Sequence, residues 1–227
     1  AAYAGYSLKY KSFGFKSGLR YEYTMMDVKF HSTKGEDFNA HFSDLVPSAN
    51  FSYQIGQTRT LKASYNMRIS RPGIWYLNPF INNSDPKNIS YGNPNLDSEK
   101  SHSFELNYSS FTQKFNINLS LGHTFVNNSI ESYSEIKNGI LNNTYENIGK
   151  WASTRLSSYI NWNMTPNTRV YLNGSGSYND FKSDKMNISN NGFSYNLNGG
   201  LQQNLPWELR LSFYGGGSGS NISFQGK

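Results

Sequence analysis

A period-two alternation of apolar and polar residues, recurring about ten times along the chain, constrains its fold more than any other feature. The clearest case runs from Phe115 to Phe125, where most odd positions carry large apolar side chains and the even ones carry Asn, Ser, Gly and Thr. Successive side chains of a β-strand point to opposite faces, so this pattern predicts strands with one apolar and one polar face. Helical periodicity is scarce. The sequence therefore predicts an all-β fold.

The alternating segments are separated by links of two kinds, short and long. We expect strands near residues 2–10, 13–30, 44–56, 59–71, 101–111, 114–134, 140–163, 168–182, 191–204 and 207–225. Short polar links lie at 11–12, 57–58, 112–113, 165–167 and 205–206, and longer ones at 31–43, 72–100, 135–139 and 183–190. Strands joined directly by hairpins form an antiparallel up-and-down meander, and tight turns at one end with loops at the other are typical of outer-membrane barrels.

Strand length and charge placement favour a membrane-spanning barrel wall over a soluble sheet. Several predicted strands exceed the roughly nine to eleven residues that cross a bilayer at a tilt. Trp162 and Trp207 lie beside two of the tight turns, where an interfacial belt of aromatic residues would be. Charged residues avoid the apolar face, as lipid exposure demands. The charges predicted to face an aqueous lumen are Arg20, Glu22, Lys62, Arg68, Glu105, Arg155, Arg169, Glu208 and Arg210.

Composition excludes several functional classes. The 227 residues contain no cysteine, which removes disulfides, thiol catalysis and cysteine-based zinc sites. The net charge of +6 comes from scattered Lys and Arg residues, so we expect no nucleic-acid partner. His31 and His41, with Asp37 and Asp44 nearby, fall in a predicted loop without a recognised metal spacing. We expect no metal, no cofactor and no enzymatic activity.

Four short strings, taken in order, resemble a known family. They are "GLRYE" at 18–22, "SRPGIWYLNPF" at 70–80, "GNPNL" at 92–96 followed by Glu99, and "ENIG" at 146–149. Their succession is similar to the barrel of TonB-dependent outer-membrane receptors, especially the outer-membrane β-barrel family common in Bacteroidetes. In that setting Pro72 ends a strand, Gly92 and Pro94 form a compact turn, and Leu96 anchors the returning chain.

The resemblance implies a role as well as a fold. It implies a barrel of 22 strands in the bacterial outer membrane, with residues 1–227 as a partial barrel domain that has no plug domain of its own. It further implies uptake of a scarce solute, with outer-membrane lipid, a plug domain, the inner-membrane TonB complex and a surface lipoprotein as partners. Siderophore, cobalamin, glycan and peptide all remain open as the solute. Trp75, Tyr76 and Tyr91 are the candidates for contacting it from the extracellular loop 72–100.

Two other architectures are compatible with the alternation. The ten strands can close as a small barrel of their own, acting as an adhesin or an outer-membrane hydrolase, in which case residues 2–10 pair with residues 207–225. They can also form a soluble β-sandwich that binds carbohydrate, in which case the apolar faces of two sheets meet in a dry core.

Overall fold

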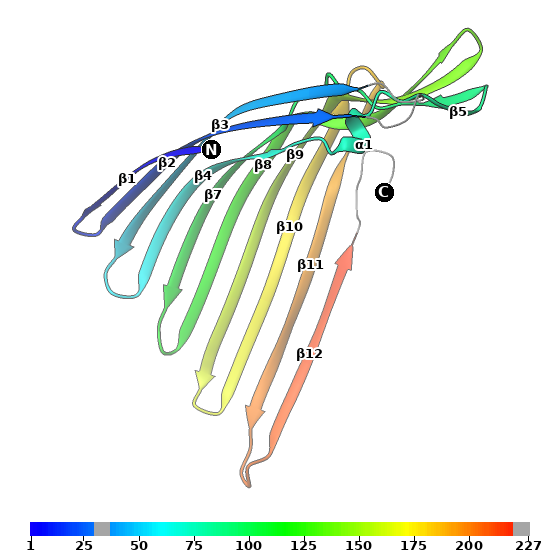
Figure 1. The fold of residues 1–227 in the computed structure, drawn as a ribbon. Helices are drawn as coiled ribbons and strands as arrows, with labels where there is room; N and C mark the ends of the chain where they lie inside the picture. The colour runs from blue at the N-terminus through cyan, green and yellow to red at the C-terminus, as the bar shows by residue number, and fades with distance from the viewer. Residues whose placement is uncertain (30–36, 220–227) are drawn as a thin grey trace.

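A computed structural model describes residues 1–29 and 37–219 and contains one large antiparallel sheet (Figure 1). Ten long strands follow one another across it in the order β1-β2-β3-β4-β7-β8-β9-β10-β11-β12. Their bounds are β1 Ala2–Tyr10, β2 Phe13–Val28, β3 Phe38–Ile55, β4 Arg59–Ser70, β7 Glu99–Phe111, β8 Phe115–Lys137, β9 Ile140–Thr165, β10 Thr168–Ser183, β11 Ile188–Asn204 and β12 Arg210–Gly219. The predicted meander of about ten long strands is confirmed.

The connection between β4 and β7 holds the remaining elements. It contains the short helix α1 (Ile74–Leu77) and two short strands, β5 (Asn82–Asp85) and β6 (Asn88–Ser90). β5 pairs with β6, and β6 adds to β9 in parallel through residues 141–143. In the described part of the chain, no helix has the length and apolar character needed to cross a membrane.

The structure corrects three strand boundaries. β3 begins at Phe38, so the loop expected at 31–43 is wrong from there on, and His41 is a strand residue; His31 lies outside the described residues. β8 and β9 run on to a two-residue turn at Asn138-Gly139, both with positive φ, in place of the longer link expected at 135–139. β12 starts at Arg210, because the link from β11 spans five residues and is closed by Leu205 N–H donating to Leu209 O.

The register assigns every strand a common pair of faces. Leu106, Leu121 and Leu156 are successive partners across β7, β8 and β9, and Glu105, Gly122 and Arg155 are partners on the opposite face. We call these the outer and the inner face. Both continue from β1 to β12 through the antiparallel pairing, which within the described residues shifts register only between Val126 and Ile130 of β8 and between Thr168 and Arg169 of β10.

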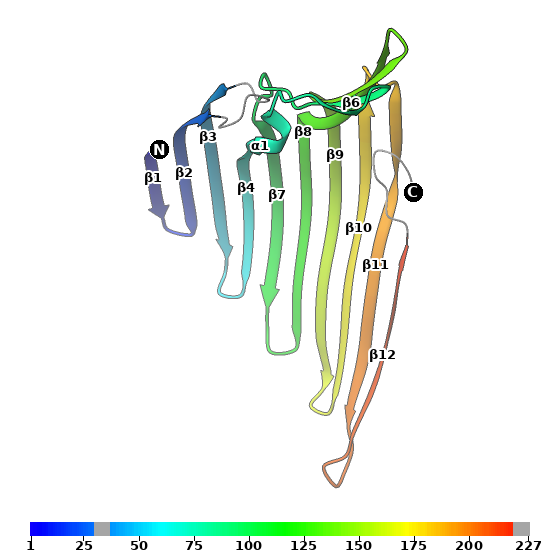
Figure 2. The same cartoon turned by 45° about the vertical axis from the view of Figure 1, so that its right-hand side comes forward.

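The sheet is open at both edges. Within residues 1–29 and 37–219, β1 pairs only with β2, and β12 pairs only with β11. The described residues thus lack the pairing of residues 2–10 with 207–225 that the small closed barrel requires. The tight turns at the lower end descend in steps from β1 to β12 (Figure 2). Such a stagger arises when strands are tilted against the axis of a barrel wall.

Candidate functional site

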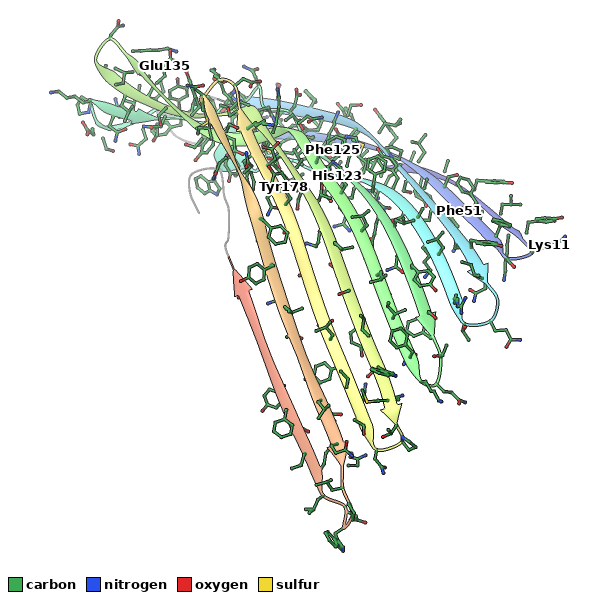
Figure 3. All side chains as sticks on the ribbon, turned by 180° about the vertical axis from the view of Figure 1, so that it is seen from behind. Lys11, Phe51, His123, Phe125, Glu135 and Tyr178 are labelled. Atoms are coloured by element: carbon green, nitrogen blue, oxygen red, sulfur yellow. The ribbon has the colours of Figure 1, made fainter. Side chains whose placement is uncertain are left out.

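The outer face is apolar and uncovered. Leu106, Leu121 and Leu156 at its centre are 46%, 48% and 57% exposed, so no second sheet packs on them. The sandwich alternative requires these side chains to meet in a dry core, and the structure contradicts it. Figure 3 shows Phe51, His123, Phe125 and Tyr178 along this face, and the register places them all on it.

Aromatic residues border the outer face at two heights. Near the lower turns, Phe115 and Trp162 are cross-strand partners, and Phe13 stacks on Tyr53 with ring centroids 4.4 Å apart. The upper border includes Tyr23, which lies ten residues above Phe13 in β2. The upper border also includes Phe125 of β8 and Tyr178 of β10. Each lies ten residues above the first residue of its strand. About nine to eleven residues cross a bilayer, and aromatic girdles flank its apolar band. The outer face has the dimensions of a lipid-facing surface.

The inner face is polar. Eight of the nine charges predicted for one face share it by register: Arg20, Glu22, Lys62, Arg68, Glu105, Arg155, Arg169 and Arg210. Glu208 does not, because it lies in the link between β11 and β12 with a φ of 60°. Surface hollows open on this face; one is lined by Lys16, Lys62 and Glu105, and another by Glu105, Ser153 and Arg155.

Many inner-face cations have no carboxylate partner. Arg20 donates from Nε to Glu22 Oε1 at 2.6 Å, and Arg169 donates from Nε to Asn161 Oδ1 at 2.6 Å. Lys62, Arg68 and Arg155, in contrast, form no ion pair with any described residue. Of the eight inner-face charges six are cations and two, Glu22 and Glu105, are carboxylates, so this wall carries a net positive charge.

The segment 71–98, here called the folded loop, covers the upper end of the inner face. Leu77 of α1, fully buried, and Leu96, 4% exposed, pack against Phe38 and Phe42 of β3. This cluster is the hydrophobic core that the described residues form, and Met26, Val28, Ile130 and Tyr145 pack at its margin. Figure 2 shows α1 lying across the upper ends of the strands. The loop is a packed structure rather than a loose connection.

A buried carboxylate fixes the start of the folded loop. Asp44, 3% exposed, accepts hydrogen bonds from Arg71 Nη2 at 3.3 Å and from Ser98 Oγ at 3.0 Å. Arg71 also donates from Nη1 to Glu22 Oε2 at 2.8 Å, and Lys100 Nζ lies 3.8 Å from Asp44 Oδ1. Residues at both ends of the loop thus share one anion, which is favourable in a partly desolvated place. We call this group the anchor.

Amide side chains fix the end of the loop. Asn147 donates from Nδ2 to Asp97 O and Asn128 O, and its Oδ1 accepts from Asp97 N–H at 2.8 Å. Asn128 makes the matching pair of bonds, with Ser98 O at 2.7 Å and Lys100 N–H at 3.0 Å. The residues that directly follow the "GNPNL" string therefore meet the "ENIG" string, which is distant in sequence.

Three comparisons with known proteins bear on this arrangement. The whole chain, residues 1–227, matches the outer membrane protein beta-barrel family. The chain belongs to this family. Its location is accordingly the bacterial outer membrane, with the outer face against lipid. None of the curated proteins matches the sequence.

Solved structures that share the fold include an iron transporter, a siderophore receptor and a copper transporter. The FrpB iron transporter from Neisseria meningitidis superimposes with a TM-score of 0.66 at 15% identity, over 94% of this chain and 32% of that one. The siderophore receptor PirA from Pseudomonas aeruginosa gives 0.58 at 15% identity, over 93% and 46%. The copper transporter OprC gives 0.59 at 14% identity, over 88% and 34%. The chain thus spans less than half the length of these proteins.

The predicted solute-contacting residues of this outer-membrane barrel protein lie on the folded loop but do not form one cluster in the described structure. Trp75, 82% exposed, projects from α1. Tyr76 packs edge-on against Tyr145, with ring centroids 4.6 Å apart. Tyr91 follows β6, and its backbone N–H donates to Asn143 O. Within residues 1–29 and 37–219, no three His, Asp or Glu side chains gather in a metal-binding group.

Sequence reasoning missed the anchor and the asparagine pair. Asp44 looked like a loop-end carboxylate near His41, whereas it is buried beside Arg71. Asn128 is one of many asparagines, and no sequence pattern distinguishes it. Asn147 is marked by the family string "ENIG". The one available signal was the "SRP" string, where Arg71 immediately precedes the proline that ends the strand.

Gly92→Ala is expected to disrupt the folded loop. A Cβ on Gly92 would lie 2.6–2.7 Å from Asn78 O, Asn78 N and Tyr76 O, all of them backbone atoms. The sequence suggested a permissive φ, but close approach of two backbone segments is what requires glycine. Gly73→Ala, where nothing lies within 4 Å, is the matched control. Limited proteolysis of the full-length protein should cut the Gly92 variant within the loop and leave the Gly73 variant intact. Equal resistance would contradict this packing.

Proposed function

We propose that this chain forms part of the barrel wall of a TonB-dependent receptor that imports a scarce solute across the outer membrane. One observation carries the proposal: a single lipid-facing sheet has a polar, positively charged inner wall whose upper end is covered by a structured loop. A barrel with such a wall encloses an aqueous path. The fold shared with iron, siderophore and copper transporters supports the same reading.

In this proposal each face has its own task. The outer face anchors the barrel in lipid, and the folded loop holds its aromatic side chains at the outer mouth. Lys62, Arg68 and Arg155, which lack carboxylate partners within the described residues, face the plug domain or the solute. The plug, the TonB complex and a surface lipoprotein belong to the complete assembly.

Uptake by intact cells tests the proposal. Cells with and without the gene are given iron-55 bound to a siderophore, cobalt-57 cobalamin, copper-64, a labelled oligosaccharide or a labelled peptide. Uptake of at least one probe should fall when the gene is deleted, and a protonophore should abolish that gene-dependent part, because TonB draws on the proton gradient. Gene-dependent uptake that survives the protonophore, or no gene-dependent uptake of any probe, would overturn the proposal.

Trp75→Ala is expected to weaken solute capture about tenfold without altering the amount of folded barrel. Exposed aromatic side chains carry much of the binding energy at such surfaces. Trp207→Ala is the control, since Trp207 is similarly exposed but lies in a tight turn at the opposite end. The measurement is the affinity of cells for whichever probe the uptake assay identifies. Equal affinities of the two variants would remove Trp75 from the site.

A further inference from the structure

All three histidines within residues 1–29 and 37–219 lie on the outer face, near the upper aromatic border. His102 and Phe104 of β7 are cross-strand partners of Phe125 and His123 of β8, so two imidazoles and two phenyl rings alternate in a square. Tyr65 of β4 adjoins this square, with its ring 4.8 Å from Phe104. We call these five residues the imidazole cluster.

The two rings are oriented by their Nδ1 atoms. His102 Nδ1 lies 2.9 Å from the Tyr65 hydroxyl, and His123 Nδ1 lies 2.9 Å from Thr154 Oγ1 on β9. When each hydroxyl donates to Nδ1, the ring proton resides on Nε2. Neither Nε2 atom has a hydrogen-bond partner among the described residues, so each Nε2–H is free to donate to a ligand.

The phenyl ring of Phe125 lies beside both imidazoles. The ring centroid of Phe125 lies 5.0 Å from that of His102 and 5.9 Å from that of His123. The cluster can therefore offer two N–H donors to one anion.

The height of the cluster on the outer face indicates which anion it can bind. His102 lies nine residues above the lower end of β7, and His123 lies eight above the start of β8, near the upper limit of the apolar band. At that height the outer face meets the headgroups of the outer leaflet, where phosphate is the abundant anion. We propose that His102 and His123 bind the phosphate of an outer-leaflet lipid, with Phe125 between them.

Binding of lipid A to the full-length protein, purified in detergent and stripped of lipid, tests this site. Native mass spectrometry counts bound bisphosphorylated lipid A, and the same lipid with its phosphates removed serves as the second probe. The test variant is His102→Phe with His123→Phe, which keeps the rings and removes the donors. The control is His41→Phe, since His41 bonds to Tyr23 on the same face but stands outside the cluster.

The double variant should hold one lipid A fewer than wild type and the His41 variant, with an affinity lower by about tenfold or more. All three proteins should bind the dephosphorylated lipid alike. If the double variant does not fold, Thr154→Val, which removes the hydroxyl beside His123, should give part of the loss. Unchanged lipid A binding by every folded variant would overturn the proposal. So would displacement of the lipid by millimolar inorganic phosphate, because the site would then take the free ion.

Discussion

Leu121→Arg is expected to destabilise the barrel by about 2–4 kcal/mol, the cost of arginine at the bilayer midplane of a β-barrel. Leu121 lies six residues above Phe115 and four below Phe125, which places it near the middle of the apolar band. Its partners Leu106 and Leu156 offer no polar group to an added guanidinium. Unfolding of the full-length protein by guanidinium chloride in liposomes, followed by tryptophan fluorescence, measures the change.

Ser120→Arg is the matched control. Ser120 precedes Leu121, faces inward, and donates from Oγ to Glu105 Oε1 at 2.7 Å, so an arginine there meets water and a carboxylate. Its cost should stay below about 1 kcal/mol. Equal destabilisation by the two variants would mean that the faces are not a lipid side and an aqueous side.

Leu77→Ala is expected to loosen the folded loop while leaving the barrel intact. Leu77 is fully buried against Phe38, Phe42 and Leu96, and removing a leucine side chain from such a place costs about 2–5 kcal/mol. The folded loop lies on the end of the sheet, off the path of its ten long strands, so most of that loss should appear as local opening of the loop. Hydrogen exchange checks this at the amides of Gly92 and Asn93, which donate to Asn78 O and Tyr76 O.

Those two amides should exchange at least about thirtyfold faster in the Leu77 variant, since about 1.4 kcal/mol corresponds to a factor of ten. Amides in the middle of β9 should be unaffected. Ile74→Ala, in the same turn of helix but 42% exposed, should change exchange only slightly. Uniform acceleration across β9 as well would indicate that the loop is a structural part of the sheet rather than a separately opening unit.

The strands could be predicted from sequence because lipid on one side and water on the other impose a strict alternation. β8 shows this best, since its apolar positions stay odd from Phe115 to Phe125. β3 shows where the rule fails. Its apolar residues are even near the top, at Phe38 and Phe42, and odd lower down, at Phe51, yet its register with β2 has no irregularity.

The reversal has a physical cause. The upper inner face of β3 is covered by Leu77 and Leu96, so apolar side chains there point inward, whereas lower down only the outer face is apolar. Because the covering segment comes from the folded loop, sequence alone does not reveal this dry patch, and the pattern predicts a loop where β3 begins. The anchor was hidden for the same reason: Asp44 and Arg71 are brought together only by the docked loop.

The sequence predicts the bounds of the turns less accurately than it predicts the strands. Asn138-Gly139 is a strong hairpin signal, and the two-residue turn there extends β8 to Lys137, three residues beyond the predicted end at 134. Glu208 was assigned to a strand because alternation continues from Trp207, but both residues have positive φ and lie in the turn. The alternation of apolar and polar residues indicates which side chains share an environment. It does not indicate the backbone torsion angles of a turn.

Spin labels along one strand test the central claim most directly. The 227 residues contain no cysteine, so single cysteines from Asn116 to Thr124 can carry labels in the full-length protein reconstituted in lipid bilayers. Labels at the odd positions should collide more with oxygen, which concentrates in lipid, than with a water-soluble nickel chelate. Labels at the even positions should show lower oxygen accessibility. A period-two pattern with this phase is the predicted result; equally low oxygen accessibility at odd and even positions would show that the apolar side chains lie in a protein core, and would contradict the account.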